Sequence, residues 1–412
     1  MNRSCRSLTS AFCAALGIVG VAQERPRPPA PPAVPLTAVP VEKPVVLTTE
    51  AGVRVRVVPI ARGLSHPDGL VFLPDNRTML LTERPGRLRI VRDEVLDPNP
   101  ILELPKLNNV SLGGLQDLVL HPDFATNHVL YLSYSKEGDR GVTLAVARAR
   151  LDGTRLADVK DIFVADAWAG EVGTYGGRMI FGPDRLLYLA VGDRDDLVST
   201  DDPHIRMEAQ NLATHIGKIL RLRDDGSVPA DNPFVTEPKA KAEIYTYGHR
   251  NPYGLAFHPQ TGALWEAEFG PRGGDEINVL VAGHNYGWPL VSTGRNYTGT
   301  PVSDQPWFRP GMEMPVFQWN PVINPANMIF YTGRKFAKWT NSPIVAGAGS
   351  KKVVQMTLTR GMVVSGDSML HELNVRFRDV RQGPDELLYF LTEGRSRGNN
   401  DTDGMLLRLE PE

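Results

Sequence analysis

Five stretches of the 412-residue sequence share one pattern, in which a short apolar run leads through a Pro-Asp or Pro-Gln turn into a second apolar run. They are HPDGLVFLPDNRTMLLTE from His66, GLQDLVLHPDFATNHVLYLSY from Gly114, GGRMIFGPDRLLYLAVGD from Gly176, NPYGLAFHPQTGALWEAE from Asn251 and RFRDVRQGPDELLYFLTE from Arg376. Proline presets the backbone of the first turn position and aspartate can bond its own backbone, so each stretch predicts a β-hairpin. A weaker copy, NMIFYTGRKFAKWTNSPIVAGA from Asn327, lies in the one long gap and makes the sixth.

The spacing of these copies indicates the architecture. They follow one another at intervals of roughly 40 to 75 residues, the range of a four-stranded propeller blade with loop insertions. Helical repeats would need apolar residues three and four positions apart, whereas these runs alternate or are uniformly apolar. We therefore expect an all-β fold, a six-bladed β-propeller with a central channel. The mouth of that channel would be formed by residues just ahead of the copies: His66, Asp68, Leu112, Thr174, Arg250 and Arg376.

The N-terminal residues 1–22 have the features of a secretory signal peptide. Arg3 and Arg6 are followed by the apolar, small-residue run LTSAFCAALGIVGVA, and polar residues begin at Gln23. This run is shorter than the roughly 20 apolar residues of a membrane-spanning helix, so we expect export to the periplasm or the cell exterior and no integral membrane segment. Residues 23–45 are rich in proline, which lacks an N–H donor and favours extended backbone, and they predict a linker. The propeller would then occupy residues 46–412.

Charge and metal-ligand content narrow the function classes. The formal net charge is −2, which argues against a nucleic-acid-binding surface. Both cysteines, Cys5 and Cys13, lie in the predicted signal peptide, so the exported chain has neither a disulfide nor a thiolate metal site. No histidine spacing indicates zinc. We expect structural roles for the turn residues His121 and His258 and a buried hydrogen-bonding role for His249.

Arginine is concentrated ahead of two of the copies. Arg250, with Asn251 beside it, lies just ahead of the fourth copy in chain order. Arg376 and Arg378 lie at the start of the sixth and last copy in chain order, RFRDVRQGPDELLYFLTE. Three guanidinium groups that converge on one channel would repel one another unless an anion lies among them, and arginine suits bidentate recognition of carboxylate or phosphate. These residues predict a small polyanionic ligand. The alternative is that each arginine caps carbonyls or pairs with a nearby acid such as Asp379.

The segment EFGPRGGDEINVL, residues 268–280, combines glycine with acidic residues. Because Ca²⁺ takes oxygen ligands from carboxylates and carbonyls, this segment is a candidate calcium loop. Its spacing is not that of a helix–loop–helix calcium motif, and acidic glycine-rich turns are also common without a metal ion.

Six longer motifs occur in one consistent order: GGLQDLVLHPDF, GGRMIFGPDRLLYLAVGDR, HIGKILRLRDDGSVPADNPF, GHRNPYGLAFHP, GPRGGDEINVLVAGHNYGWP and RFRDVR. Together they resemble the soluble quinoprotein aldose sugar dehydrogenases, the glucose/sorbosone dehydrogenase family, from about Gly63 to the C-terminus. The resemblance implies a six-bladed propeller that binds pyrroloquinoline quinone (PQQ), a tricarboxylated cofactor, over the channel mouth with Ca²⁺ against its quinone edge. It also implies oxidation of an aldose or related sugar or alcohol, with an external electron acceptor.

Carried over by motif, the resemblance gives Arg250 a contact with the quinone oxygen whose charge grows in the transition state, with Asn251 beside it. Arg376 and Arg378 would hold the cofactor carboxylates. Asp193 matches an acid that orients the catalytic base.

The same resemblance implies two calcium sites. The backbone carbonyls of Gly270 and Pro271 would ligate the cofactor calcium. Glu276 and Tyr286 match positions associated with a second, structural calcium.

The sequence departs from the family at the catalytic base. The family has a histidine ahead of the Gly-Gly-Arg of the third copy, where GEVGTYGGRM has Thr174. A hydroxyl cannot accept a proton near neutral pH as imidazole does. His66, close to Asp68, is the best substitute, yet SHPDG is more often simply a turn ahead of a strand. Tyr175 is a better acid than base, because the ordinary pKa of tyrosine is about 10.

Two further positions depart from the family. Leu112 replaces a glutamine that lines the substrate side, and the cofactor-binding lysine of the fifth blade has no clean equivalent among Ser350, Lys351 and Lys352.

Three hypotheses follow. The first is a PQQ- and calcium-dependent sugar dehydrogenase with altered site residues, which the clustered arginines favour. The second is a calcium-bound propeller of the same family that has lost PQQ oxidation and catalyses another reaction, which Thr174 and Leu112 favour. The third is a non-catalytic carbohydrate- or protein-binding module, whose signature would be an exposed apolar or aromatic patch on one rim.

Overall fold

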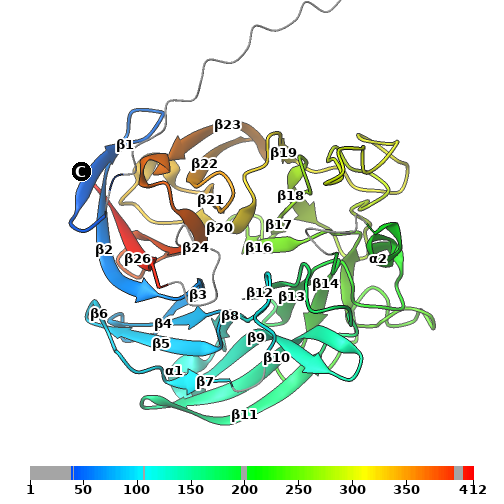
Figure 1. Cartoon of the computed structure of the whole chain (residues 1–412), viewed down its shortest axis with the longest axis horizontal. Coiled ribbons are helices and arrows are strands. Elements are labelled where there is room, and N and C mark those ends of the chain that lie inside the picture. Colours follow the sequence, from blue (N-terminus) through cyan, green and yellow to red (C-terminus); the bar gives the residue numbers. More distant parts are fainter. Residues whose placement is uncertain (1–38, 40, 105–106, 196–201, 394–401) are drawn as a thin grey trace, which may run out of the picture. The chain divides into compact units, whose positions relative to one another are not determined.

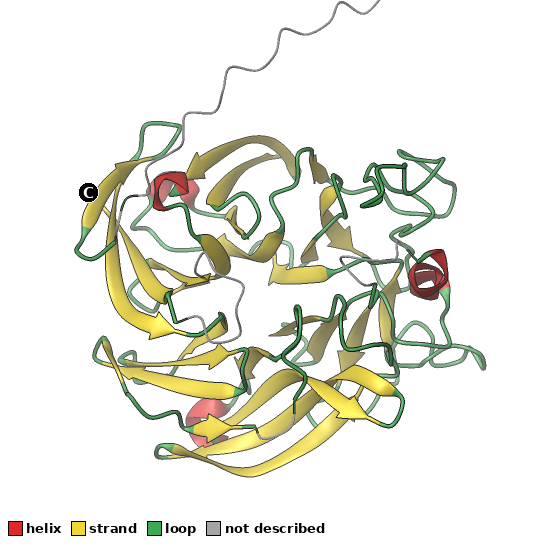
Figure 2. Ribbon diagram, in the orientation of Figure 1, coloured by secondary structure: helices red, strands yellow, loops and turns green. Residues whose placement is uncertain are grey.

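Six antiparallel β-sheets surround a central axis in the computed structural model (Figure 1), and strands far outweigh helices (Figure 2). The structure describes residues 39, 41–104, 107–195, 202–393 and 402–412. The predicted signal peptide and most of the predicted linker lie outside these ranges. The all-β, six-bladed propeller expected from the repeats is confirmed, and each copy supplies the first two strands of one blade.

The strands of the first three blades follow the chain. Blade 1 contains β3 (Pro67–Phe72), β4 (Thr78–Glu83), β5 (Arg87–Arg92), β6 (Val95–Leu96) and β7 (Leu102–Glu103). Blade 2 contains β8 (Leu115–Leu120), β9 (Val129–Gly138), β10 (Gly141–Asp152) and β11 (Arg155–Val164). Blade 3 contains β12 (Gly176–Phe181), β13 (Leu187–Val191), β14 (Lys218–Leu222) and β15 (Ile244–Tyr247).

The next two blades repeat this order, and short helices lie in the connections. Blade 4 contains β16 (Pro252–Phe257), β17 (Leu264–Glu268), β18 (Asp275–Leu280) and β19 (Phe317–Trp319), and blade 5 contains β20 (Pro325–Tyr331), β21 (Ser342–Gly347), β22 (Lys352–Thr359) and β23 (Met362–Met369). The helices are α1 (Phe124–Asn127), α2 (Pro203–Met207), η1 (Glu208–Gln210), η2 (Ala337–Trp339) and η3 (His371–Leu373). Within the described ranges, no helix is long and apolar enough to cross a membrane.

Blade 6 closes the ring with both ends of the propeller. Its sheet joins β24 (Arg376–Gln382), β25 (Leu388–Glu393) and β26 (Gly404–Pro411) to β2 (Arg54–Leu64) and β1 (Val45–Thr48). β2 and β26 pair in antiparallel register from Val55 opposite Pro411 to Leu64 opposite Gly404. Val41 is 4% exposed within the core that blades 5 and 6 share, so the folded unit reaches into the segment predicted as linker.

The Pro-Asp turns behave as the sequence predicts. Asp75 Oδ1 accepts hydrogen bonds from the backbone N–H groups of Arg77 (3.0 Å) and Thr78 (2.9 Å). Asp184 and Asp385 accept in the same way from the residues two positions on, at 3.2 and 3.1 Å. These bonds fix the turn locally, which is why the hairpins could be recognised without tertiary information.

Each innermost strand has a shift in pairing register near its first residue, a feature that the sequence did not reveal. The shifts lie between Pro67 and Leu70, Leu115 and Leu118, Gly176 and Met179, Pro252 and Gly254, Pro325 and Asn327, and Phe377 and Asp379. A bulge redirects the side chains within it. Among the redirected residues, Arg178 donates to Asp117 Oδ1 at 2.9 Å and Arg378 donates to Asp68 Oδ1 at 3.0 Å, so ion pairs fill the channel.

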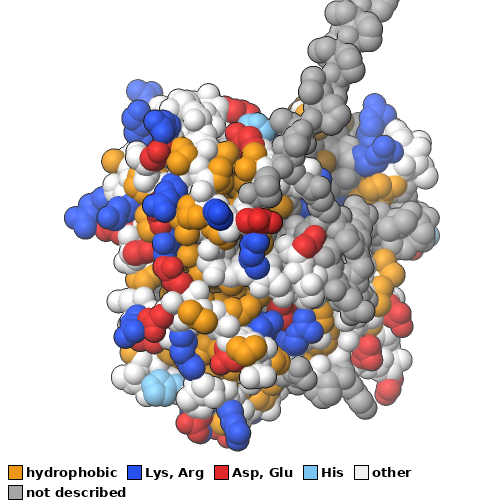
Figure 3. Space-filling view, turned by 60° about the vertical axis from the view of Figure 1, so that its left-hand side comes forward, with side chains coloured by type: hydrophobic (Ala, Val, Ile, Leu, Met, Phe, Trp, Pro, Cys, Tyr) orange, Lys and Arg blue, Asp and Glu red, His pale blue; other side chains and the backbone are white. Residues whose placement is uncertain are grey.

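The outer surface carries both signs of charge. Basic and acidic side chains are interspersed over the face shown in Figure 3, in keeping with the net charge of −2.

Candidate functional site at the channel mouth

A cavity of about 540 Å³ lies where the chain enters the six innermost strands. Every blade contributes a lining residue: His66, Leu112, Val172, Arg250, Asn324 and Arg376. Four of these were expected at the mouth. Thr174 and Asp68 were expected there too, but they are 0% and 1% exposed and do not line the cavity.

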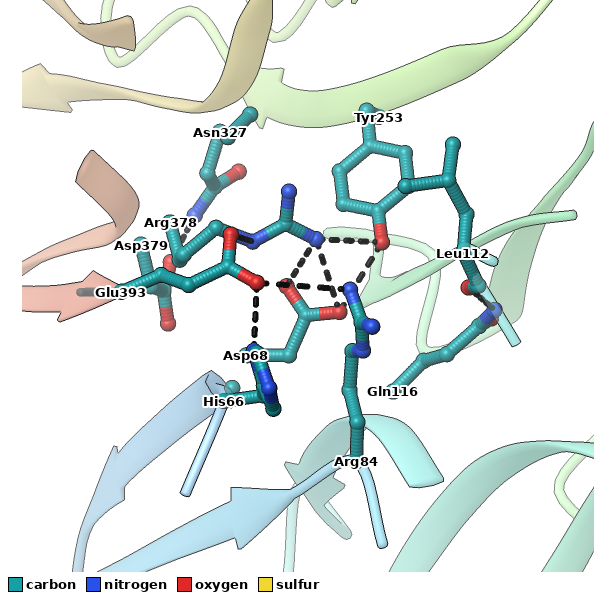
Figure 4. A network of polar contacts seen from close by, with 12 residues as sticks. His66, Asp68, Arg84, Leu112, Gln116, Tyr253, Asn327, Arg378, Asp379 and Glu393 are labelled. Carbon is teal, nitrogen blue, oxygen red and sulfur yellow. Dashed lines mark hydrogen bonds and ion pairs between the residues drawn. The ribbon is translucent and has the colours of Figure 1, made fainter. Parts of the chain in front are cut away.

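Glu393 is the centre of the charged wall of this cavity. His66 Nδ1 donates to Glu393 Oε1 at 2.5 Å, and Arg376 Nε donates to Glu393 Oε2 at 3.1 Å. Arg84 Nη1 lies 3.7 Å from Glu393 Oε1 (Figure 4). Burial alone would raise the pKa of Glu393, but the bond from His66 and the charges of Arg378, Arg84 and Arg376 outweigh burial and hold the pKa well below its ordinary value. The carboxylate is therefore ionised and surrounded by excess positive charge.

Arg378 is buried beside this wall and does not line the cavity. Its Nη2 donates to Asp68 Oδ1 at 3.0 Å and to the Tyr253 hydroxyl at 2.9 Å (Figure 4). Its Nη1 has no hydrogen-bond partner among the described residues. Both arginines of blade 6 are thus paired with acids, although with Glu393 and Asp68 rather than with Asp379.

Arg250 lines the cavity and retains hydrogen-bonding capacity. Its Nη1 donates to the carbonyls of Phe269 (3.1 Å) and Gly270 (3.0 Å), and its backbone N–H donates to Glu268 Oε2 at 2.7 Å. Its guanidinium carbon lies 5.6 Å from the centre of the Trp288 ring. Nε and Nη2 are buried and have no partner within the described part of the chain. Arg250 is therefore held rigidly with two donors to offer.

Thr174 and Asp193 form a closed pair. The Thr174 hydroxyl donates to Asp193 Oδ1 at 2.6 Å, and Trp288 Nε1 donates to Asp193 Oδ2 at 2.7 Å. Asn251 Oδ1 accepts from the Gly176 N–H at 3.1 Å nearby. The Tyr175 hydroxyl donates to the Glu171 carbonyl at 2.6 Å. The Thr174 hydroxyl is thus fixed as a hydrogen-bond donor to Asp193.

Two predicted groups of metal ligands lie close to the cavity. Gly270 lines it, and a Cβ on Gly270 would stand 2.2 Å from the Gly273 carbonyl oxygen, so only glycine fits there. Glu276, Tyr286 and Glu268 line a small space of about 10 Å³ that adjoins the cavity, because Arg250 and Gly270 line both. Its volume is close to the smallest that holds one water-sized particle. Burial, with the nearby Glu268, raises the pKa of Glu276 to about 8.

The remaining sequence candidates have structural contacts. His121 Nδ1 accepts from the Asp123 N–H at 2.9 Å, and His258 Nδ1 accepts from the Gln260 N–H at 3.2 Å. Lys351 Nζ donates to Asn374 and Lys352 Nζ donates to Ser368, both at 3.0 Å. Neither lysine lines the cavity, to which blade 5 contributes Asn324 instead.

The sequence reasoning missed Glu393 and Arg84. A signal for the former was present, because the second apolar run of several copies ends in an acid: Glu83, Glu268 and Glu393. These positions end the second strand of their blades, at the same end as the start of the first strand. Arg84 follows one of these acids directly and carries no signal of its own.

The fold and this cavity define a six-bladed propeller with a charged site at one mouth of its channel. The chain belongs to the Glucose / Sorbosone dehydrogenase family, whose profile matches residues 64–407.

Known members of similar sequence and structure carry related names. The aldose sugar dehydrogenase YliI of Escherichia coli is 38% identical over 352 residues, which cover 84% of this chain and 91% of that protein. The apo structure of the soluble aldose sugar dehydrogenase of Escherichia coli superposes with a TM-score of 0.79 at 37% identity, covering 87% of this chain and 100% of the other. The PQQ-bound aldose sugar dehydrogenase of Streptomyces coelicolor superposes with a TM-score of 0.69 at 26% identity, covering 91% and 100%. The family supports an oxidoreductase acting on a small sugar.

Proposed function

We propose that this protein is an exported, PQQ- and calcium-dependent dehydrogenase that oxidises an aldose or related sugar or alcohol at the channel mouth and passes the electrons to an external acceptor. The observation that carries the proposal is Arg250, which lines the 540 Å³ cavity with two guanidinium nitrogens that lack partners among the described residues. Arginine donors in a water-poor site suit a growing negative charge on oxygen.

The residues present fit an anionic quinone. Arg84, Arg250 and Arg376 line one cavity, and Arg84 and Arg376 share Glu393 as their acid there. PQQ, when bound, would be the oxidant of the sugar. Arg376 would hold one of its carboxylates and Arg250 would meet the quinone oxygen. Asn251 is fully buried and does not line the cavity, so it would support Arg250 from behind. Arg378 would likewise act from behind, through Glu393 and Asp68.

The residues also fit calcium. The carbonyls of Gly270 and Pro271 would face the cofactor ion, since Gly270 lines the cavity. Glu276 and the backbone of Tyr286 would hold a second ion in the 10 Å³ space. Carbonyl and carboxylate oxygens are the ligands that Ca²⁺ prefers.

His66 is the base we propose in place of Thr174. Both His66 and Glu393 line the cavity, and Glu393 fixes the ring by accepting from Nδ1. An imidazole oriented by a carboxylate holds its other nitrogen, Nε2, as the proton acceptor. Thr174 would keep Asp193 in place and take no proton.

The test is dye reduction by the purified protein reconstituted with PQQ and Ca²⁺ and offered a panel of aldoses. His66→Asn should lower kcat about 10²- to 10⁴-fold, the range for loss of a general base. His258→Asn is the matched control, because His258 lies in an outer turn, and it should keep wild-type activity. Equal activity of wild type and His66→Asn would refute the role of His66.

Thr174→His should raise turnover by restoring the family's base. No dye reduction by the reconstituted wild type would reject the dehydrogenase.

A second candidate has its own support. The connection between β18 and β19 exposes the large apolar side chains of Trp307, Phe308 and Met314 by 66%, 56% and 52%, as expected of a binding module. In this case the charges of Arg376 and Arg378 are balanced by Glu393 and Asp68 without a cofactor. Stabilisation by Ca²⁺ alone, no PQQ binding, and binding of an oligosaccharide or protein that Trp307→Ala abolishes would favour it.

A further inference from the structure

A second group of potential metal ligands lies on the face of blade 4. Glu266 and Glu268 alternate along β17, so both side chains point to the same face, and Asn278 of β18 stands opposite Glu266. His249, in the segment between β15 and β16, completes the group. His249 Nδ1 lies 3.9 Å from Glu268 Oε1, and ligand atoms of the histidine and both glutamates all lie within 4.8 Å of one another.

This group is sealed from solvent and leaves polar atoms unsatisfied. The exposed fractions are 0% for His249 and Glu266, 4% for Glu268 and 1% for Asn278. His249 Nδ1, Glu266 Oε1 and Asn278 Oδ1 have no hydrogen-bond partner in the described ranges. A buried polar atom without a partner destabilises the folded state, so three such atoms in one place indicate a bound group that satisfies them.

The hydrogen bonds that are made leave these atoms available. The ring is held from its other side, because Thr246 Oγ1 lies 2.9 Å from His249 Nε2. Asn278 Nδ2 donates to Glu266 Oε2 at 3.0 Å and to Glu268 Oε1 at 3.3 Å, so its amide oxygen is left as an acceptor. Ring and carboxylates are thus oriented in advance.

The charge of the group points to a cation. Glu266 and Glu268 form no ion pair with lysine or arginine among the residues that the structure describes. Lys218 is nearby, but its ammonium group donates to the carbonyls of Glu208, Ala209 and Ile216. Buried carboxylates are paired, protonated or bound to a metal.

We propose that His249, Glu266 and Glu268 bind a divalent transition metal ion of the zinc or manganese type, with Asn278 as an additional oxygen ligand. Imidazole nitrogen with carboxylate oxygen is a donor set for Zn²⁺ or Mn²⁺, whereas Ca²⁺ takes oxygen ligands only. The ion would join blade 4 to the segment that leads out of blade 3. This site does not depend on PQQ or on sugar oxidation.

The proposed site differs from the calcium position at Glu276 and Tyr286. That position has no nitrogen donor, whereas the metal group proposed here contains His249. The two adjoin and both involve Glu268, which lines the 10 Å³ space and stands opposite Glu276 in the strand register. The His249 ring stacks on Tyr286 at 4.9 Å. Experiments must therefore separate them by metal and by residue.

The test uses the purified protein, prepared without an affinity tag that binds metal, stripped with a chelator and dialysed against Zn²⁺, Mn²⁺ or Ca²⁺. Bound metal is counted by mass spectrometry, and the visible spectrum of bound Co²⁺ reports the nitrogen and oxygen ligands. Wild type should retain one equivalent of Zn²⁺ or Mn²⁺ and gain thermal stability from it. Glu266→Gln should weaken that binding at least tenfold, the effect expected for loss of a ligand.

Three controls make the result decisive. Glu276→Gln should lose the response to Ca²⁺ and keep the transition metal, and the exposed Glu237→Gln should keep both. His249→Phe preserves ring stacking on Tyr286 but removes the nitrogen, so it provides a second reading if Glu266→Gln is poorly folded. The proposal is overturned if stripped wild type takes up neither Zn²⁺ nor Mn²⁺ stoichiometrically, or if Glu266→Gln and His249→Phe bind them as wild type does. Neither outcome bears on dye reduction, which tests the dehydrogenase separately.

Discussion

The central channel and the face of blade 4 that carries Glu266 and Glu268 both bury acidic side chains, but among the described residues only those of the channel are paired with arginines. In the channel Asp117 Oδ1 accepts from Arg178 (2.9 Å) and Arg381 (3.0 Å), and Asp117 Oδ2 accepts from the Met179 N–H (2.8 Å). On blade 4, the carboxylate of Glu266 has the Asn278 amide as its only hydrogen-bond partner within the described chain. Buried acids that are paired with arginines need no further partner and serve as a scaffold. Buried acids that lack a cationic partner can bind a ligand of opposite charge.

The channel mouth lies between these two extremes. Glu393, the one carboxylate among the described residues that line it, is surrounded by cationic side chains, so the unmatched charge is positive. The propeller thus separates a neutralised channel, a cationic mouth suited to an anion and an acidic group suited to a cation.

Breaking the channel network should have the largest effect. Arg178→Met removes the buried guanidinium that lies 2.9 Å from Asp117 and 3.7 Å from Asp379. The two acids are left with the less buried Arg381 as the arginine they share. We expect the free energy of unfolding to fall by about 3–5 kcal/mol, measured by urea denaturation. Arg185→Met removes an arginine whose side chain is 56% exposed and should change stability by less than about 0.5 kcal/mol. Equal effects of the two substitutions would contradict the scaffold role.

Removing the carboxylate at the mouth should have an intermediate effect. Because the folded pKa of Glu393 lies below its ordinary value, its contribution is present above about pH 4.3, the unfolded value, and is lost as the pH falls further. Glu393→Gln should lower the free energy of unfolding by about 1–3 kcal/mol at pH 7, and the difference from wild type should shrink toward pH 3. Urea midpoints at several pH values check this. A difference that does not depend on pH would show that charge is not the cause.

Removing an acid from blade 4 should have the smallest effect in the absence of metal. Glu266→Leu takes away an uncompensated buried carboxyl, so with chelator present we expect the free energy of unfolding to change by less than about 1 kcal/mol or to rise. With Zn²⁺ or Mn²⁺ added, the wild type should become the more stable of the two. A large loss of stability in chelator would mean that Glu266 is already satisfied, as the channel acids are.

Much of the architecture could be predicted from local sequence. The hairpin turns at Asp75, Asp184 and Asp385 are fixed by bonds within two or three residues, and blade 5, which lacks the Pro-Asp turn, gave the weakest copy. The mouth positions His66, Leu112, Arg250 and Arg376 followed from the blade geometry alone. Asp68 was misplaced because the register shift in β3 redirects its side chain, and such a shift has no signature in an apolar pattern. Thr174 was misplaced because its hydroxyl donates to the buried Asp193 instead of lining the cavity.

The pairing of charges could not be predicted. Arg378 and Asp68 are 310 residues apart, and His66 and Glu393 are 327 apart, so each pair forms only when blade 6 closes against blade 1. His249 is buried and forms a hydrogen bond with Thr246, as expected. Its position beside Glu266 and Glu268 could not be predicted, because these residues follow it by a full β-strand and offer no zinc-like spacing.

By itself, the sequence determined the class of fold, the number of blades and the family, because these depend on turns and strand periodicity that act over a few residues. The tertiary structure decided which charges are neutralised and which are left over, because that depends on the distances between side chains of different blades. Electrostatic energy in a buried site varies steeply with the separation of the charges and with their solvent exposure. Neither the separation nor the exposure can be derived from the sequence alone.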